Sequence, residues 1–181
     1  MMNALFFVLA TAIGTQPVQA TTDVRSNDAV LAFDDLCVSL FIGKEAKADP
    51  ARFSVTKISD GTARKIKPNL NGQTLWDVSG TQSDVHLLVH YEPAGLCVVE
   101  VAEADEKAMR VEFERLVQQV SSFLDATPQR QADKRNRVDG KDATSSAWRL
   151  KSPKGDIMLA VTTYPDPKFM IQHLMTASYV Q

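Results

Sequence analysis

Two stretches of 18 residues, "WDVSGTQSDVHLLVHYEP" at 76–93 and "WRLKSPKGDIMLAVTTYP" at 148–165, decide the expected fold. Each begins with Trp, ends with Pro and contains apolar residues in alternation, the spacing that is typical of half-buried strands. At an offset of 72 residues, the two stretches are identical at five positions. We interpret them as two copies of one building block. The alternative is two unrelated strand pairs that share residues common in β-structure.

An amphipathic segment with helical spacing precedes each stretch. Residues 28–43 have Asp28 as the expected N-cap and Gly43 as the expected residue beyond the helix C-terminus. Residues 105–127 have an acidic start, which suits a helix N-terminus, and Pro128 ends the pattern. The sequence therefore predicts two helices.

The remaining periodic segments are rich in β-branched and aromatic residues and are separated by short polar or Pro-Gly turns, so they are predicted to be strands. The order α-β-β-β then occurs twice, in units 28–103 and 104–181. We expect an α+β domain with an antiparallel sheet of about six strands and two helices packed on one face, built by tandem duplication. The last expected strand also fits a helix. The expected strands are 74–80, 84–92, 96–102, 145–152, 156–164 and 168–180.

The first 20 residues have the pattern of a secretory signal peptide. The apolar run "ALFFVLATAI" at 4–13 is too short to span a bilayer, and "VQA" at 18–20 fits a cleavage site. No Lys or Arg precedes the run, which departs from the usual pattern, and a buried N-terminal helix or strand is the alternative. We expect cleavage to leave residues 21–181 as a single globular domain without a membrane span, in the periplasm or outside the cell.

Export suggests a structural role for the two cysteines, Cys37 and Cys97. In an oxidising compartment a disulfide is the default for two cysteines. Neither has a nearby His, and there is no C-x-x-C spacing that would indicate a metal ligand or a catalytic thiol. The sequence therefore predicts a Cys37–Cys97 disulfide.

The spacing of the three histidines does not indicate a metal site. On an expected strand, His86 and His90 share a face but lie about 13 Å apart, too far to share one ion. His173 is remote in sequence. We interpret the three as solvent-facing residues of the sheet, with no metal and no cofactor expected.

No catalytic constellation is recognisable either. The acidic residues Asp34, Asp35, Glu103, Asp105 and Glu106 fall on expected, solvated helix surfaces. There is no G-x-S-x-G elbow, phosphate-binding Gly loop or H-E-x-x-H motif. We therefore assign no catalytic residue.

The two longest connections are basic. Residues 44–69 contain seven Lys or Arg against three acidic residues, and residues 130–142 contain five against three. Such loops can bind an anionic partner, although they can also be solvated surface that keeps a protein soluble. The candidate binding residues are Arg64, Lys65, Lys67, Lys134, Arg135 and Arg137.

The net charge argues against a nucleic-acid-binding protein. The chain has 181 residues, 44% of them hydrophobic, and its net charge of −2 lacks the basic excess expected of a nucleic-acid-binding domain. Trp76 and Trp148 could anchor a partner if exposed, but their equivalent strand positions favour the core.

We therefore expect an exported, non-enzymatic protein that binds a protein or another anionic macromolecule of the cell envelope. It would act as an inhibitor or immunity-type protein, or as an accessory factor of an envelope machine. The alternative is a small periplasmic hydrolase whose site is assembled only in the tertiary fold, with one of the three histidines beside a carboxylate or a serine in a cleft.

Overall fold

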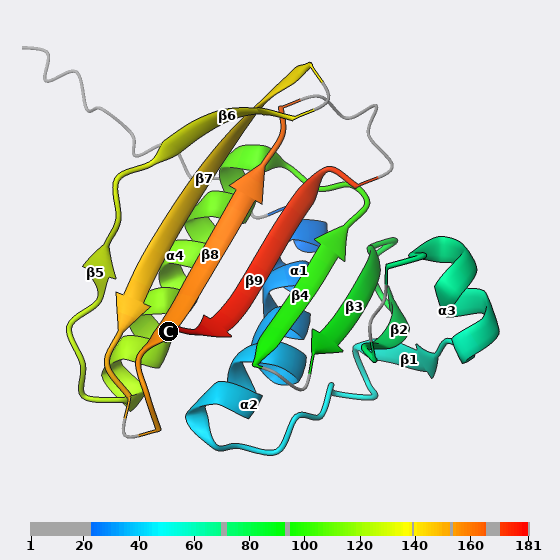
Figure 1. The fold of residues 1–181 in the computed structure, drawn as a ribbon, viewed down its shortest axis with the longest axis horizontal. Helices are drawn as coiled ribbons and strands as arrows, with labels where there is room; N and C mark the ends of the chain where they lie inside the picture. Colours follow the sequence, from blue (N-terminus) through cyan, green and yellow to red (C-terminus); the bar gives the residue numbers. More distant parts are fainter. Residues whose placement is uncertain are drawn as a thin grey trace, which may run out of the picture.

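A single antiparallel sheet of nine strands dominates the computed structural model (Figure 1). The structure describes residues 23–69, 72–92, 95–138, 140–152, 154–165 and 171–180, so the expected signal peptide lies outside it. The strand order is β1-β2-β3-β4-β9-β8-β7-β5, and β6 pairs separately with β7. The strands are β1 (Phe53–Lys57), β2 (Thr74–Gly80), β3 (His86–Glu92), β4 (Leu96–Val101), β5 (Gln129–Arg130), β6 (Lys134–Val138), β7 (Lys141–Leu150), β8 (Ile157–Thr163) and β9 (His173–Tyr179).

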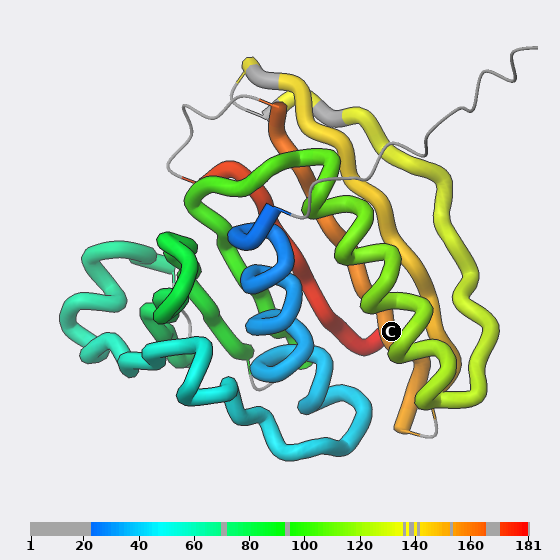
Figure 2. The backbone as a smooth tube through the Cα atoms, turned by 180° about the vertical axis from the view of Figure 1, so that it is seen from behind, coloured from blue at the N-terminus to red at the C-terminus, as the bar shows by residue number. Residues whose placement is uncertain are grey.

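Two long helical segments cover one face of this sheet, and they lie in front of it in Figure 2. The first consists of α1 (Val24–Phe33), one stretch of π-helix named η1 (Asp34–Val38) and α2 (Ser39–Ile42), in direct succession. The second is α4 (Glu106–Phe123). A short helix, α3 (Asp60–Ile66), lies apart from both, beside β2. The predicted α+β class with an antiparallel sheet is thus confirmed.

The strand count differs from the expected six because β1, β5 and β6 form within connections that looked like loops. Phe53 is the only buried residue of β1, and β5 has only two, exposed residues. Strands at the edge of a sheet bury little apolar surface, so they lack the alternation by which strands are recognised. Helix α3 was missed for the same reason, since Ala63 is its only buried residue.

The two expected units occupy the two halves of the sheet. Strands β2-β3-β4 form one meander and β7-β8-β9 the other, and β4 pairs with β9 in the middle. Each meander follows one of the helices that cover the sheet. The last segment is a strand over its described part, His173–Tyr179, and not a helix. The duplication itself stays a prediction.

The core lies between the helices and the sheet. Aromatic rings pack across it, with Phe33 of α1 5.6 Å from Phe113 of α4, and Phe113 5.6 Å from Trp148 of β7, between ring centroids. Cys37 in η1 is joined to Cys97 in β4, with 5.4 Å between their Cα atoms. This confirms the predicted disulfide, which fastens the first helical segment to the middle of the sheet.

The first helix begins earlier than predicted. Asp23, not Asp28, is its N-cap, and it accepts a hydrogen bond from the backbone N–H of Ser26. Asp28 is instead 3% exposed inside the helix, where it makes an ion pair with Arg52 and accepts a hydrogen bond of 2.5 Å from Ser83 Oγ. The C-terminus is as predicted, because Gly43 takes a left-handed φ of 79°.

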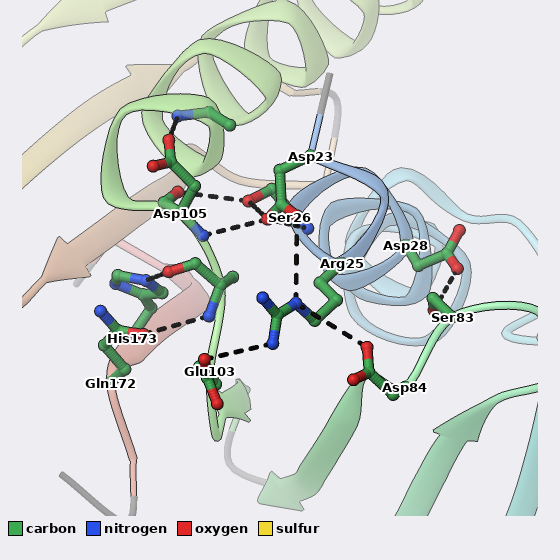
Figure 3. A network of polar contacts seen from close by, with 12 residues as sticks. Asp23, Arg25, Ser26, Asp28, Ser83, Asp84, Glu103, Asp105, Gln172 and His173 are labelled. Carbon is green, nitrogen blue, oxygen red and sulfur yellow. Dashed lines mark hydrogen bonds and ion pairs between the residues drawn. The ribbon is translucent and has the colours of Figure 1, made fainter. Parts of the chain in front are cut away.

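The starts of both long helices are fastened together by Asp23 and Asp105 (Figure 3). Asp23 Oδ2 accepts a hydrogen bond of 3.0 Å from the backbone N–H of Asp105. Asp105 in turn is the N-cap of α4, because its Oδ1 accepts a hydrogen bond of 2.7 Å from the backbone N–H of Ala108. Arg25 adds an ion pair of 3.2 Å to Glu103. The acidic residues at this end are therefore explained by helix capping and helix pairing.

Candidate functional site: the open face of the sheet

The face of the sheet that points away from the long helices has no covering layer over β3, β4, β9 and β8 in the part of the chain that is described (Figure 1). Among the described elements only α3 packs on it, at the edge, where Ala63 and Leu75 are buried. We call this surface the open face. A sheet covered on one side only normally turns charged and polar side chains to water on the other.

The strand register defines which residues share the open face, in three rows that run across the sheet. The middle row begins at β3, and a row of similar length lies on each side of it. The middle row is His90, Val98, Thr176, Ala160 and Ala147; the flanking rows are Leu88, Glu100, Leu174, Thr162 and Ser145, and Glu92, Leu96, Ser178, Met158 and Arg149.

The centre of the open face is neutral. On the three central strands β4, β9 and β8, Glu100 is the only charged residue in these rows. Leu96, Leu174 and Met158 are half-buried there, although no further layer covers them. The middle row between them consists of Val98, Thr176 and Ala160, but each of the three apolar residues also has one charged register partner, namely Glu92 for Leu96, Glu100 for Leu174 and Arg149 for Met158. A sheet face that carries half-buried apolar residues and no covering layer can serve as a docking surface for another macromolecule.

Glu100 itself is part of a buried polar network at the α3 end of the open face. The residue is 6% exposed, and its Oε1 makes an ion pair with Lys67 Nζ and lies 3.4 Å from His90 Nε2. His90 Nδ1 lies 2.8 Å from Gln73 Oε1, and Gln73 Nε2 donates 2.9 Å to Glu92 Oε1. The network links the loop before β2 to strands β3 and β4.

This network keeps Glu100 ionised. Burial by itself would raise the pKa of the carboxyl group, but the contacts with His90 and Lys67 outweigh burial and hold its pKa below the ordinary value of 4.5. Its other oxygen, Oε2, has no hydrogen-bond partner among the described residues. Glu100 and Lys67 therefore form a neutral pair, and the open face gains no net charge from them.

The six candidate binding residues lie in two groups at opposite ends of the sheet. Five strand spacings separate β2, beside α3, from β7, beside β6, which amounts to about 24 Å at about 4.8 Å per spacing. The structure therefore does not join the two groups into one patch. Those of the α3 end are Arg64, Lys65 and Lys67, and those of β6 are Lys134, Arg135 and Arg137.

The candidate residues of the α3 end differ in accessibility, whereas Lys134, Arg135 and Arg137 of β6 are all exposed. Arg64 and Lys65 are exposed on α3, whereas Lys67 is half-buried and paired with Glu100.

A polar cleft of about 500 Å³ lies between β6, β7 and the start of α4. Arg135 and Arg137 line it together with two acids, Glu106 and Asp142. Arg137 Nε also donates 2.9 Å to the carbonyl of Gly140. Since the charges that line the cleft balance, it is not by itself an anion site.

Two of the three histidines are not solvent-facing, which corrects the sequence interpretation. His86 is exposed on the open face, but the side chain of His90 is 11% exposed. His173 is fully buried on the helical side, where its Nε2 lies 2.9 Å from the Ala104 carbonyl, and burial lowers its pKa. No group of three or more potential ligands for a metal ion occurs in the described ranges.

The Asp34–Asp35 pair is also less solvated than expected. Both residues lie in η1 and are half-buried, and burial raises the pKa of each. Of the two tryptophans, Trp148 is in the core as predicted, at 4% exposed, whereas Trp76 is only half-buried.

Sequence reasoning did not find the open-face residues. The signal was present in the strands, because the positions between the core residues carry Leu88, Met158, Ala160 and Leu174 where charged residues are usual. Glu100 could not be found, since only the tertiary fold brings Lys67 and His90 to it.

No protein-family model, curated protein or solved structure matches this chain. Among its described helices, none has both the length and the apolar content needed to cross a bilayer.

Proposed function

We propose that this protein is an exported, non-enzymatic binding protein that recognises a protein partner through the open face. The observation that carries the proposal is the neutral centre of that face, where Leu96, Leu174 and Met158 are half-buried without a covering layer. Removing this surface from water would favour association by the hydrophobic effect. The Cys37–Cys97 disulfide supports export, because disulfides persist mainly in oxidising compartments.

The basic groups suggest the charge of the partner. Arg64 and Lys65 at one end and Lys134 and Arg135 at the other flank the neutral centre. A partner with an apolar strip between acidic ends would complement this surface in both apolarity and charge. An exported enzyme blocked by this protein, or a component of an envelope machine that it assists, would satisfy that description.

A hydrolase is the second candidate, because His90 lies beside the carboxylate of Glu100. The contacts of His90 favour a structural role for this residue instead. The two ring nitrogens of His90 face Gln73 and Glu100, so neither is directed at a substrate. Glu100 is also paired with Lys67.

A capture experiment tests the proposal. Oxidised protein comprising residues 21–181 is immobilised and incubated with an envelope extract at low and moderate salt, and captured proteins are identified. We expect one discrete partner whose capture weakens with salt, since exposed charges are screened. Ala160→Arg places a charge in the centre of the open face and should abolish capture. Gln118→Arg adds the same charge to the exposed side of α4 and should have no effect.

Two results would overturn the proposal. If neither salt condition captures a partner, the binding function fails and substrate screening of wild type and His90→Gln becomes the next test. If Ala160→Arg and Gln118→Arg capture equally well, binding does not use the open face.

A further inference from the structure

A separate cleft of about 430 Å³ lies on the helical side of the sheet, at the β1 end. It lies between the helical segment and the first three strands, on the side opposite to the open face, and we call it the apolar cleft. Its volume is within the range of small-molecule sites. The main lining residues are Leu36, Leu40, Val55, Trp76, Val89 and Tyr91.

The fold leaves this cleft because the helices do not extend over β1 and β2. Trp76 and Val89 are register partners on neighbouring strands, and both turn toward the helical side. Leu36 and Leu40 form the opposite wall, from η1 and α2, on either side of Cys37. The disulfide from Cys37 to β4 therefore holds the two walls at a set distance.

The segment after α2 completes the cleft. It runs from Gly43 to β1 along this side of the molecule (Figure 2). The backbone N–H of Lys47 donates a hydrogen bond of 3.2 Å to the carbonyl oxygen of Asp35. The backbone N–H of Asp49 donates a hydrogen bond of 3.4 Å to the carboxylate of Asp35. These contacts hold Lys47 at the rim.

The charge of the cleft is one-sided. Lys47 is its only charged lining residue, and it makes no ion pair with the described residues. The rest of the lining is aliphatic or aromatic. A cavity with apolar walls and one unpaired ammonium group at its rim complements a molecule with an apolar body and an anionic end.

We propose that the apolar cleft binds a single-chain amphiphile with an anionic head group, such as a fatty carboxylate. The alkyl chain lies between Leu36, Leu40 and Trp76, and the carboxylate faces Lys47. This site is distinct from the open face and does not depend on the function proposed for that face. The other candidate occupant is an apolar side chain of a protein partner. Its binding to the cleft would not depend on the charge of Lys47.

Trp76 provides the readout. In a Trp148→Phe variant it is the only tryptophan, so its emission reports the cleft alone. Dodecanoate is titrated below its critical micelle concentration. We expect a saturable blue shift of the emission, and binding that is about fivefold weaker in Lys47→Gln, the effect of one exposed charge pair. Dodecyltrimethylammonium, with the same chain and a positive head, should bind more weakly than dodecanoate.

Two variants act as controls. Lys44→Gln makes the same change of charge three residues away, where Lys44 lies over the ring of Phe123 and outside the cleft, and should bind dodecanoate as the parent does. Val55→Glu fills the mouth of the cleft from a residue that is 42% exposed and repels a carboxylate, so the fold should tolerate the change and binding should be lost. Circular dichroism checks that each variant is folded.

The proposal is overturned if dodecanoate causes no saturable change in Trp76 emission, or if a folded Val55→Glu variant binds it as tightly as the parent does. Equal affinity for dodecanoate and dodecyltrimethylammonium, or equal affinity of Lys47→Gln and Lys44→Gln, would likewise refute an anion-selective site. Capture of a partner by the open face should be the same in Val55→Glu and wild type, which separates the two proposals.

Discussion

Lys67, the residue that ends α3, forms an ion pair with Glu100 in β4, 33 residues further along the chain. This contact fastens a short peripheral helix to the centre of the sheet. Helix α3 has seven residues and one buried side chain, so it has little other tertiary support. The Lys67–Glu100 ion pair therefore also fixes the position of the exposed Arg64 and Lys65 on α3.

Glu100→Gln should destabilise the protein at neutral pH by roughly 1–3 kcal/mol, because it leaves Lys67 and His90 beside a neutral amide. The folded-state pKa of Glu100 is lowered, so its contribution is present above pH 4.5 and is lost as the pH falls through the folded-state value. Urea unfolding at pH 7 and pH 3.5 should show the difference between variant and wild type shrinking at the lower pH. A constant difference would contradict an ionic role.

The disulfide should be a main source of stability. It closes a loop of 60 residues, for which the chain-entropy model gives about 4 kcal/mol. We expect urea unfolding of Cys37→Ala/Cys97→Ala to show a loss of this order, with no further effect of a reducing agent. If the reduced wild type were as stable as the oxidised form, the disulfide would have no such role.

Asp23→Ala should cost about 1–2 kcal/mol, the usual effect of losing a helix N-cap. The upper part of the range is expected, since Asp23 also accepts from the N–H of Asp105 and so holds the starts of α1 and α4 together. Thermal unfolding measures the loss. Asp84→Ala is the control, because the side chain of Asp84 is 82% exposed and makes only a distant contact with Arg25. Equal losses in both variants would show that the cap is not important.

His173 should make stability fall as the pH is lowered from 7 to 5. Burial lowers its folded-state pKa below 6.5, although the Ala104 carbonyl and the acids Glu106 and Asp105 act in the opposite direction. The neutral ring is therefore favoured in the folded state, and the unfolded state takes up a proton first as the pH falls through 6.5. Uptake of this one proton can lower the free energy of unfolding by up to about 1.4 kcal/mol per pH unit.

The test compares the pH dependence of urea unfolding in wild type and His173→Gln at pH 7, 6 and 5. Gln retains a donor for the Ala104 carbonyl but does not titrate. We expect a shallower loss of stability in the variant. Parallel curves would assign the pH dependence to other groups.

Periodic patterns in the sequence determined the central elements of the fold. The two amphipathic segments, the strands from β2 to β4 and from β7 to β9, and the Cys37–Cys97 pair follow from local spacing and from cysteine chemistry. These elements bury one continuous face, so the period of their apolar residues is set by their geometry. The weakly buried β1, β5 and α3 leave no such period.

Only the tertiary structure decided where function can reside. Strand order separates the basic groups of α3 and β6 by the width of the central sheet. It also brings Lys67 and His90 to Glu100, and Leu36 and Leu40 to Trp76. Such contacts join residues far apart in the chain. They depend on which strands pair and how far the helices extend, and a local pattern contains no information about either.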